Sequence, residues 1–346
     1  MKSLGLSRYA LSSCVAAAML AGCGGGQPPI GASSAIRQSV AQHSLAAQRS
    51  AGAAQLGSDG ASWMLPEANG EDLLYVSNGP ASSHNSAWVT VYSYPRGKLV
   101  GILRGFAAPA GECVDRGGNV FITDTDTGKI FEYAHGGKHP IATLPAPGPD
   151  SLGCSVDPTT GNLAVSSLGF GNNGAVGIYK GAKGSPKLYK NRAFQMYYFC
   201  GYDNSGNLFV DGQNYASSAF EFAELAQGDT KLKSVTLNQS IGFPGGVQWD
   251  GKYVTVGDQN TSIVYQFSIS GDVGTEAGST TLGGSDVGAV LQYFIVGSRL
   301  IAPNACSGKC VGNVLYFPYP SGGDATKTIT KDVHYPRGLV VSKAND

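Results

Sequence analysis

Residues 109–133 read PAGECVDRGGNVFITDTDTGKIFEY, and this stretch decides the fold class of the chain. It contains three short runs of β-forming residues, and a Gly-containing turn separates each run from the next. Gly118-Asn119, which follows Asp115, supplies the positive φ that a tight hairpin turn needs. The stretch therefore predicts three antiparallel strands joined by two hairpins.

The same unit recurs six times along the chain. Its second strand returns every 43 to 47 residues, beginning at Leu74, Val120, Leu163, Leu208, Tyr253 and Leu300. The first strand has the form P-x-G at 109–115, 244–250 and 336–342, and a weak fourth strand follows the third, as at 140–144 and 233–237. Four strands repeated six times predict an all-β fold, a six-bladed β-propeller with four antiparallel strands per blade, over residues 67–346.

The register of the repeats predicts how the ring closes. Residues 338–342 form a first strand without the rest of its unit, whereas residues 73–77 form a second strand without a first. We expect the C-terminal strand to join the N-terminal blade, because this arrangement leaves no open sheet edge at the seam.

The composition fits a β-rich globular chain and excludes one class of partner. Of 346 residues, 50 are Gly, 42% are hydrophobic and only 14% are charged. Lys plus Arg number 24 and Asp plus Glu number 24, so there is no basic excess to neutralise phosphates. We therefore expect no nucleic-acid partner.

The N-terminus resembles a bacterial lipoprotein signal peptide. Lys2 and Arg8 precede an apolar stretch, residues 9–20, that is too short to span a membrane as a mature helix. The sequence Leu-Ala-Gly-Cys that ends at Cys23 resembles the lipobox. The resemblance implies that residues 1–22 are removed and that Cys23 carries the lipid.

A lipid on Cys23 would hold the protein in the bacterial cell envelope. Gly24, rather than Asp, follows the cysteine, and this implies sorting to the outer membrane. Residues 23–66 are rich in Gly, Ala, Ser and Gln, a composition that predicts a flexible tether between the lipid and the propeller.

The repeat itself resembles a known class of propeller. The pattern P-x-G-Φ-x-Φ-D followed by G-N-Φ-Φ-Φ-x-D, where Φ is apolar, is similar to NHL-repeat propellers and to the six-bladed class that includes gluconolactonase-like and strictosidine-synthase-like proteins. The resemblance covers about residues 72–346. Gluconolactonase-like enzymes hold a divalent cation in the axial channel with Glu, Asn and Asp. This chain lacks their Glu-Gly-Pro at the first blade, where Glu67-Ala-Asn is the nearest sequence.

Polar residues end the six second strands and would converge at one mouth of the channel: Asn78, Asp124, Ser167, Asp211, Asp258 and Asn304. Carboxylate and amide oxygens are ligands that Ca²⁺ accepts. Asn78, Asp124, Asp211, Asp258 and Asn304 are therefore candidate channel-mouth or metal residues. The alternative is that these side chains cap turns and hold no cofactor.

Five cysteines remain after the signal peptide and Cys23 in an exported, oxidising setting. Cys306 and Cys310 would close a small loop between two strands, and we expect a disulfide there. Cys113, Cys154 and Cys200 lie on innermost strands of neighbouring blades. Cys154 and Cys200 occupy the same position in the repeat, so they point to equivalent faces, and only Cys113 is out of phase. A second pair, if one forms, is therefore Cys113 with Cys154; otherwise these three are small buried residues.

The sequence carries no catalytic signature of the common hydrolases. It lacks G-x-S-x-G, H-E-x-x-H and C-x-x-C. We therefore expect a membrane-anchored, non-enzymatic propeller that presents a rim or funnel to an envelope protein or a small-molecule ligand. The alternative is a metal-dependent lactonase or esterase of the gluconolactonase-like class with a divalent cation in the channel.

Overall fold

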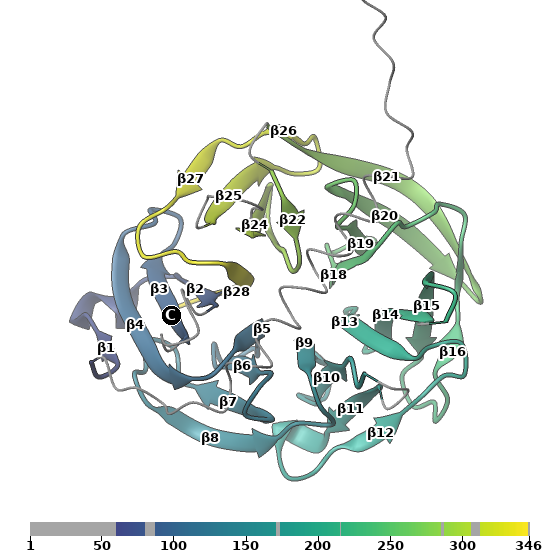
Figure 1. Cartoon of the computed structure of the whole chain (residues 1–346), viewed down its shortest axis with the longest axis horizontal. Helices are drawn as coiled ribbons and strands as arrows, with labels where there is room; N and C mark the ends of the chain where they lie inside the picture. Colours follow the sequence, from purple (N-terminus) through teal and green to yellow (C-terminus); the bar gives the residue numbers. More distant parts are fainter. Residues whose placement is uncertain are drawn as a thin grey trace, which may run out of the picture.

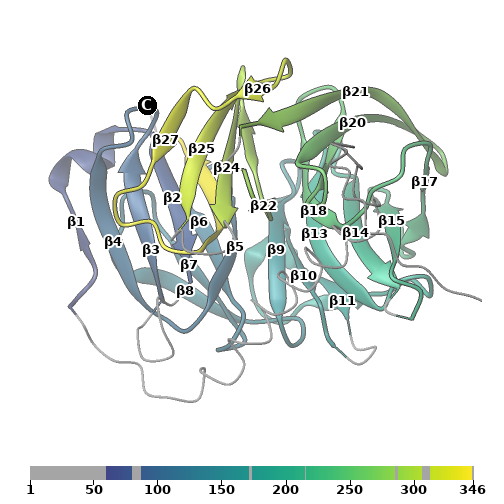
Figure 2. The same cartoon turned by 45° about the horizontal axis from the view of Figure 1, so that its top comes forward.

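The computed structural model describes residues 60–79, 87–170, 174–214, 216–284, 287–305 and 312–344. Six small sheets surround a central axis, and the chain passes around the ring once (Figure 1). Figure 2, which is tilted, shows the strands of each blade running between the two faces of the ring. The prediction of an all-β, six-bladed propeller is confirmed.

Each blade starts with an inner strand at the axis and ends with an outer strand at the rim. The inner strands are β28 (Pro336–Ser342), β5 (Pro109–Val114), β9 (Ser151–Val156), β13 (Met196–Tyr202), β18 (Pro244–Trp249) and the pair β22 (Ala289–Val290) and β23 (Phe294–Val296). The second strands are β2 (Leu73–Asn78), β6 (Val120–Asp124), β10 (Leu163–Ser167), β14 (Leu208–Asn214), β19 (Val254–Asp258) and β24 (Arg299–Ala305). The third strands are β3 (Ala87–Ser93), β7 (Lys129–Tyr133), β11 (Ala175–Tyr179), β15 (Ala219–Leu225), β20 (Ile263–Ser270) and β25 (Asn313–Pro318). The outer strands are β4 (Leu99–Phe106), β8 (Pro140–Pro145), β12 (Lys187–Tyr189), β16 (Lys233–Ser234), β21 (Val273–Gly283) and β27 (Lys327–Ile329).

Blade 1 is built from both ends of the chain. β28 pairs antiparallel with β2, with Tyr75 opposite Val340, so the expected closure of the ring is confirmed. A fifth strand, β1 (Trp63–Met64), pairs with the outer strand β4 and is followed by the short helix η1 (Pro66–Gly70). The sheet of blade 1 therefore begins at Trp63, before residue 67. Gly101 on β4 permits this pairing, because a Cβ there would lie 2.3 Å from the Met64 sulfur.

The outer edges of blades 4 and 5 depart from the simple repeat. Residues 233–237, expected as one strand, divide between two blades: β16 pairs with β15, whereas β17 (Thr236–Leu237) pairs in parallel with β21. Val235 between them is buried in the hydrophobic core, which turns the chain from one blade to the next. β26 (Gly323–Asp324) also pairs in parallel with β21. A second short helix, η2 (Lys180–Ala182), follows β11.

The turns between inner and second strands have the predicted chemistry. Gly118, Gly161 and Gly206 have φ of 81°, 71° and 84°. In blade 2 the Asp115 carboxylate accepts hydrogen bonds from the main chain and side chain of Asn119, both at 2.8 Å. These turns together form what we call the hairpin face of the ring. The opposite face, where second strands connect to third strands, is the loop face.

Glycines allow the inner strands of neighbouring blades to approach each other. A Cβ on Gly111 would lie 2.0 Å from the carbonyl oxygen of Leu152, and one on Gly338 would lie 2.0 Å from that of Ala110. Because real Cβ atoms do not approach an oxygen this closely, only glycine fits there. Apolar side chains then pack between the blades, and Phe121 of blade 2 and Val165 of blade 3 belong to one buried cluster.

Candidate functional site

The polar residues that end the second strands hold their own blades together at the loop face. Asp124 accepts hydrogen bonds from the N–H groups of Ala107 and Ala108 at 2.9 and 2.8 Å, and Asp258 accepts them from Gly242 and Phe243 at 3.0 and 3.1 Å. Each bonded segment leads directly into the inner strand of the same blade.

The other members of this set make the same connection. Asn78 accepts a hydrogen bond from the N–H of His334 at 2.7 Å, and Asn304 accepts one from Gly288 at 2.7 Å. Ser167 donates to the carbonyl of Pro149 at 2.5 Å. The oxygens proposed from the sequence as metal ligands are thus engaged by main-chain donors, which gives these residues a structural role.

Asp211 does not belong to the residues that end the second strands, because the alignment of the six repeats was wrong by one residue in blade 4. Its Oδ1 accepts a hydrogen bond from the N–H of Phe199 at 2.7 Å, the role that Thr123 plays for Gly111 in blade 2. Asp211 is completely buried, and its Oδ2 has no hydrogen-bond partner in the structure as described. Burial raises the pKa of Asp211 well above its ordinary value.

Among the described residues, no group of three or more His, Cys, Asp or Glu side chains is arranged to hold a metal ion. The ring of turn-capping oxygens does not fit a shared cation either, since each side chain faces the main chain of its own blade. Binding of a divalent cation in the channel stays a prediction.

Cysteines line the axis on three successive inner strands. Cys113 of β5 and Cys154 of β9 form a disulfide with Cα atoms 5.6 Å apart. Cys200 of β13 is a buried free thiol, and burial raises its pKa, so it is not a reactive thiolate at neutral pH. Cys23, Cys306 and Cys310 lie outside the described residues.

A hollow that the described residues form on the axis opens toward the hairpin face. Its volume is about 380 Å³. Residues from blades 2 to 6 line it, including the Cys113–Cys154 disulfide and the aromatic side chains of Tyr202, Trp249 and Phe294. Most of its polar groups are already bonded: Ser155 accepts the N–H of Tyr202 at 3.0 Å. A cavity of this size and mixed character fits a small molecule.

Glu112 is the one acidic side chain among the residues that line this cavity. Its Oε1 accepts a hydrogen bond from Ser77 Oγ at 2.7 Å, while Oε2 finds no partner within the described ranges. Burial raises the pKa of Glu112 well above its ordinary value, although the bonds from Ser77 and from the Val340 main chain oppose this rise. Burial therefore favours the protonated form of Glu112, which offers an O–H donor.

Gln292 lies beside Glu112 and joins blade 6 to blade 2. Its Nε2 donates to the carbonyl oxygen of Glu112 at 2.7 Å, and its Oε1 accepts the N–H of Glu112 at 3.0 Å. The two residues are 180 positions apart. This amide therefore forms one wall of the cavity and ties together the two blades that flank blade 1.

Trp249 contributes a second unpartnered group. The side chain lines both the axial cavity and a smaller hollow of about 190 Å³ between blades 4 and 5. Its Nε1 is buried, and no acceptor for it exists in the described part of the chain. An N–H in this situation is costly unless a ligand or water accepts it.

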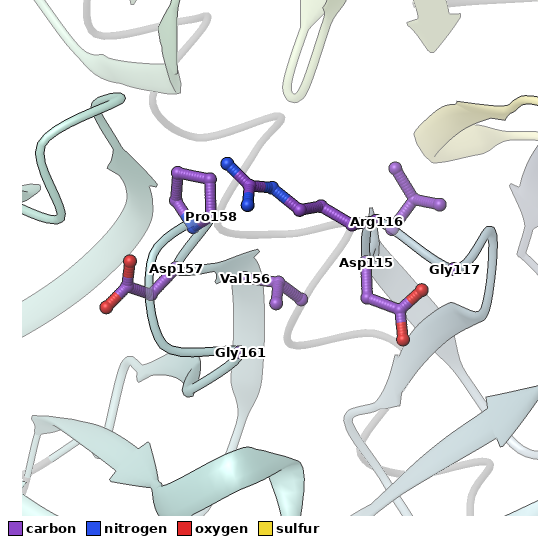
Figure 3. A pocket seen from close by; sticks show the side chains of 8 residues that line it. Asp115, Arg116, Gly117, Val156, Asp157, Pro158 and Gly161 are labelled. Atoms are coloured by element: carbon purple, nitrogen blue, oxygen red, sulfur yellow. The ribbon is translucent and has the colours of Figure 1, made fainter.

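A groove of about 300 Å³ extends the cavity between the turns of blades 2 and 3. It shares Val114, Val156 and Pro158 with the axial cavity. Figure 3 shows that the guanidinium of Arg116 reaches toward Pro158, whereas the carboxylates of Asp115 and Asp157 turn away from each other. Arg116 thus places a positive charge on the rim of the hairpin face.

Sequence reasoning missed Glu112, Gln292, Trp249 and Arg116 as site residues. Glu112 carried a usable signal, because an acidic residue inside the buried strand PAGECV is unusual. Gln292 gave no such signal, since its partner is distant in sequence.

No helix in the described ranges is long and apolar enough to cross a membrane.

Neither a protein-family model nor any curated protein matches the chain. Solved structures do resemble it. A protein of unknown function from Bacteroides caccae has a TM-score of 0.59 at 14% identity, over 79% of this chain and 99% of that chain. A chain of a nidogen/laminin complex has a TM-score of 0.62 at 13% identity, over 80% of this chain and 99% of that one. At these identities the similarity shows the fold alone.

Proposed function

We propose that this protein is a non-enzymatic binding propeller whose axial cavity receives a small uncharged molecule from the hairpin face. The propeller fold supports a binding or scaffold role. The observation that carries the proposal is the pair of buried, unpartnered polar groups that line the cavity, Glu112 Oε2 and Trp249 Nε1.

These two groups indicate what the ligand offers. Protonated Glu112 and the Trp249 indole are both donors, so the ligand supplies acceptors such as hydroxyl, ether or carbonyl oxygens. Tyr202 and Phe294 provide apolar faces against which a ring packs. A ligand with a formal charge gains little electrostatic binding energy from Glu112, because the neutral form of this side chain provides no countercharge. A ring compound with several oxygens fits this description.

Two sequence features support the rest of the proposal. The absence of hydrolase signatures favours binding without turnover. The lipobox-like sequence ending at Cys23 favours attachment to the cell envelope, with the residues between Cys23 and Trp63 as the tether. For the anchor, Cys23→Ser is expected to abolish incorporation of radiolabelled palmitate and to release the protein from the membrane fraction.

p-Nitrophenyl glucoside is a suitable first probe of the cavity, because it combines an aromatic ring with several oxygens and quenches tryptophan fluorescence. We expect saturable quenching that is lost in Trp249→Phe and retained in Trp63→Phe, since Trp63 is exposed on β1. We expect no release of p-nitrophenol. Equal quenching in both variants contradicts the assigned cavity, and release of p-nitrophenol contradicts the non-enzymatic role.

A further inference from the structure

Arg337 occupies a position near the axis that other blades fill with apolar side chains. Gly338 pairs with Ser77, as Gly111 bonds to Thr123 and Gly153 bonds to Ser166. The residue before each glycine is therefore equivalent from blade to blade, and it is Ala110 in β5, Leu152 in β9 and Arg337 in β28. Ala110 and Leu152 belong to one buried hydrophobic cluster.

The two Nη atoms of Arg337 are buried and lack acceptors among the described residues. The residue is only 5% exposed, and neither Nη1 nor Nη2 has a hydrogen-bond partner in the described structure. The nearby carboxylates of Asp124 and Asp126 support its charge, but burial lowers the pKa of Arg337 to about 10, so it stays cationic at neutral pH. Both oxygens of Asp124 already accept main-chain N–H groups. A buried cation in this state calls for an added acceptor.

A second unpartnered donor lies at the same end of the axis. Gln213 pairs with Met196, the first residue of β13, so it stands at the loop face as Arg337 does. Its Oε1 accepts a hydrogen bond from Tyr198 at 3.3 Å, while its buried Nε2 has no acceptor among the described residues.

We propose that Arg337 anchors a site for a small monovalent carboxylate at the loop-face end of the axis. Two carboxylate oxygens match the two free Nη atoms in the planar, bidentate geometry that arginine favours. The negative field of Asp124 and Asp126 disfavours a dianion such as sulfate. The near-complete burial of Arg337 and Leu152 restricts the occupant to a small group.

This site is separate from the cavity of the proposed function. Arg337 is absent from the lining of the axial cavity, which opens at the hairpin face. Loss of one site therefore leaves the other measurable, and quenching by p-nitrophenyl glucoside reports on the cavity alone.

The test compares the melting temperature of the full chain in sodium acetate, sodium chloride and sodium sulfate at equal ionic strength and pH. We expect acetate to raise the melting temperature by about 2–4 °C over chloride at concentrations well above the dissociation constant. Sulfate stabilises proteins in general, so the rise in melting temperature that it causes in Arg337→Met is subtracted. The remaining rise is expected to be smaller in sulfate than in acetate. Equal melting temperatures in acetate and chloride contradict the proposal.

Variants of Arg337 complete the test. Arg337→Met removes the charge and keeps the length, so the specific acetate effect disappears, while Arg299→Met, at an exposed arginine of β24, retains it. In chloride, Arg337→Met is expected to melt at or above the wild-type temperature, because two buried donors without acceptors have gone. A strongly destabilised Arg337→Met shows instead that the protein itself pairs the guanidinium, and this overturns the proposal. Arg337→Lys keeps the charge but loses the planar, bidentate donor geometry, so a weakened acetate effect is expected there.

Discussion

At the scale of single residues, the inner strands contain ionisable side chains at positions where other blades have small or apolar ones. Glu112 occupies the position of Cys154 and Cys200 in the next two blades. Burial raises the pKa values of both Glu112 and Asp211. The folded chain therefore keeps these protons to a higher pH than the unfolded chain, which releases them near pH 4.5 from Glu112 and near pH 3.8 from Asp211, and its stability depends on pH.

Glu112→Gln isolates the contribution of Glu112 to this dependence. The pKa of Glu112 is higher in the folded state, so the stabilising effect of its proton is complete below pH 4.5 and declines as pH rises toward the folded-state pKa. We expect the free energy of unfolding of the wild type to fall relative to Glu112→Gln by up to about 1.4 kcal/mol per pH unit in that window. Urea unfolding at pH 5 and pH 7 measures this, and a constant difference between the two proteins contradicts it.

The sequence predicts residues whose partners are local and misses those whose partners are distant. Asp115 and Gly118 follow from a four-residue turn, and Asp124 could be recognised as a turn cap. Asp211 was misplaced because the residue of blade 4 that is equivalent to Asp124 is Gly212, which has no side chain, and Asp211 is the polar residue next to it. Gln292 of blade 6 bonds to Glu112 of blade 2, 180 positions away in the sequence, and no local pattern encodes such a contact.

At the scale of strands, the inner strands of blades 2 and 3 are linked covalently. Cys113 on β5 faces Cys154 on β9, whereas Cys200, which shares the position of Cys154, points back to the carbonyl of Ala164 in blade 3. Cys154 and Cys200 hold the same position in the repeat and therefore point to equivalent faces of their blades. This alone is enough to disfavour a bond between them. The division of residues 233–237 between two blades could not be predicted, because it depends on the place at which Val235 packs into the hydrophobic core.

Removal of this link is expected to destabilise the propeller without changing its fold. The bond joins residues 41 positions apart, for which loop-closure entropy gives about 4 kcal/mol. We expect Cys113→Ser/Cys154→Ser to unfold at lower denaturant concentration than the wild type, and a reducing agent to shift only the wild type. Cys200→Ala is the control, since it leaves the disulfide and its response to reductant intact. A reductant-insensitive wild type shows that the bond contributes nothing.

At the scale of the whole molecule, the ring depends on a seam that both chain ends form. β28 contributes Leu339, Val340 and Val341, all of them buried, and it covers the inner edge of β2. The repeat spacing was enough to predict this architecture, because each blade is a local unit and the leftover strands at the two ends are complementary. The axial cavity could not be predicted, since it depends on side chains from five blades meeting at one place.

Deletion of residues 336–346 should abolish the folded state. Burial of the three apolar side chains alone accounts for roughly 6 kcal/mol, a large share of the stability of a typical domain. We expect no cooperative thermal transition by circular dichroism and aggregation on gel filtration. A chain that lacks only residues 345–346 keeps β28 and is expected to melt like the wild type. A cooperative melt of the larger deletion contradicts the role of the seam.

The same seam determines when the molecule can become a folded protein. Ala344 bonds to Asp72, a residue 272 positions earlier. During synthesis or transport across a membrane, the first blade emerges at the start and lacks its inner strand until the last residues arrive. Its open β2 edge stays exposed throughout, which favours pairing with other chains. Contacts of such long sequence separation also form slowly. A chain of this design therefore benefits from a holding chaperone that covers its first strands until the C-terminal strand is delivered.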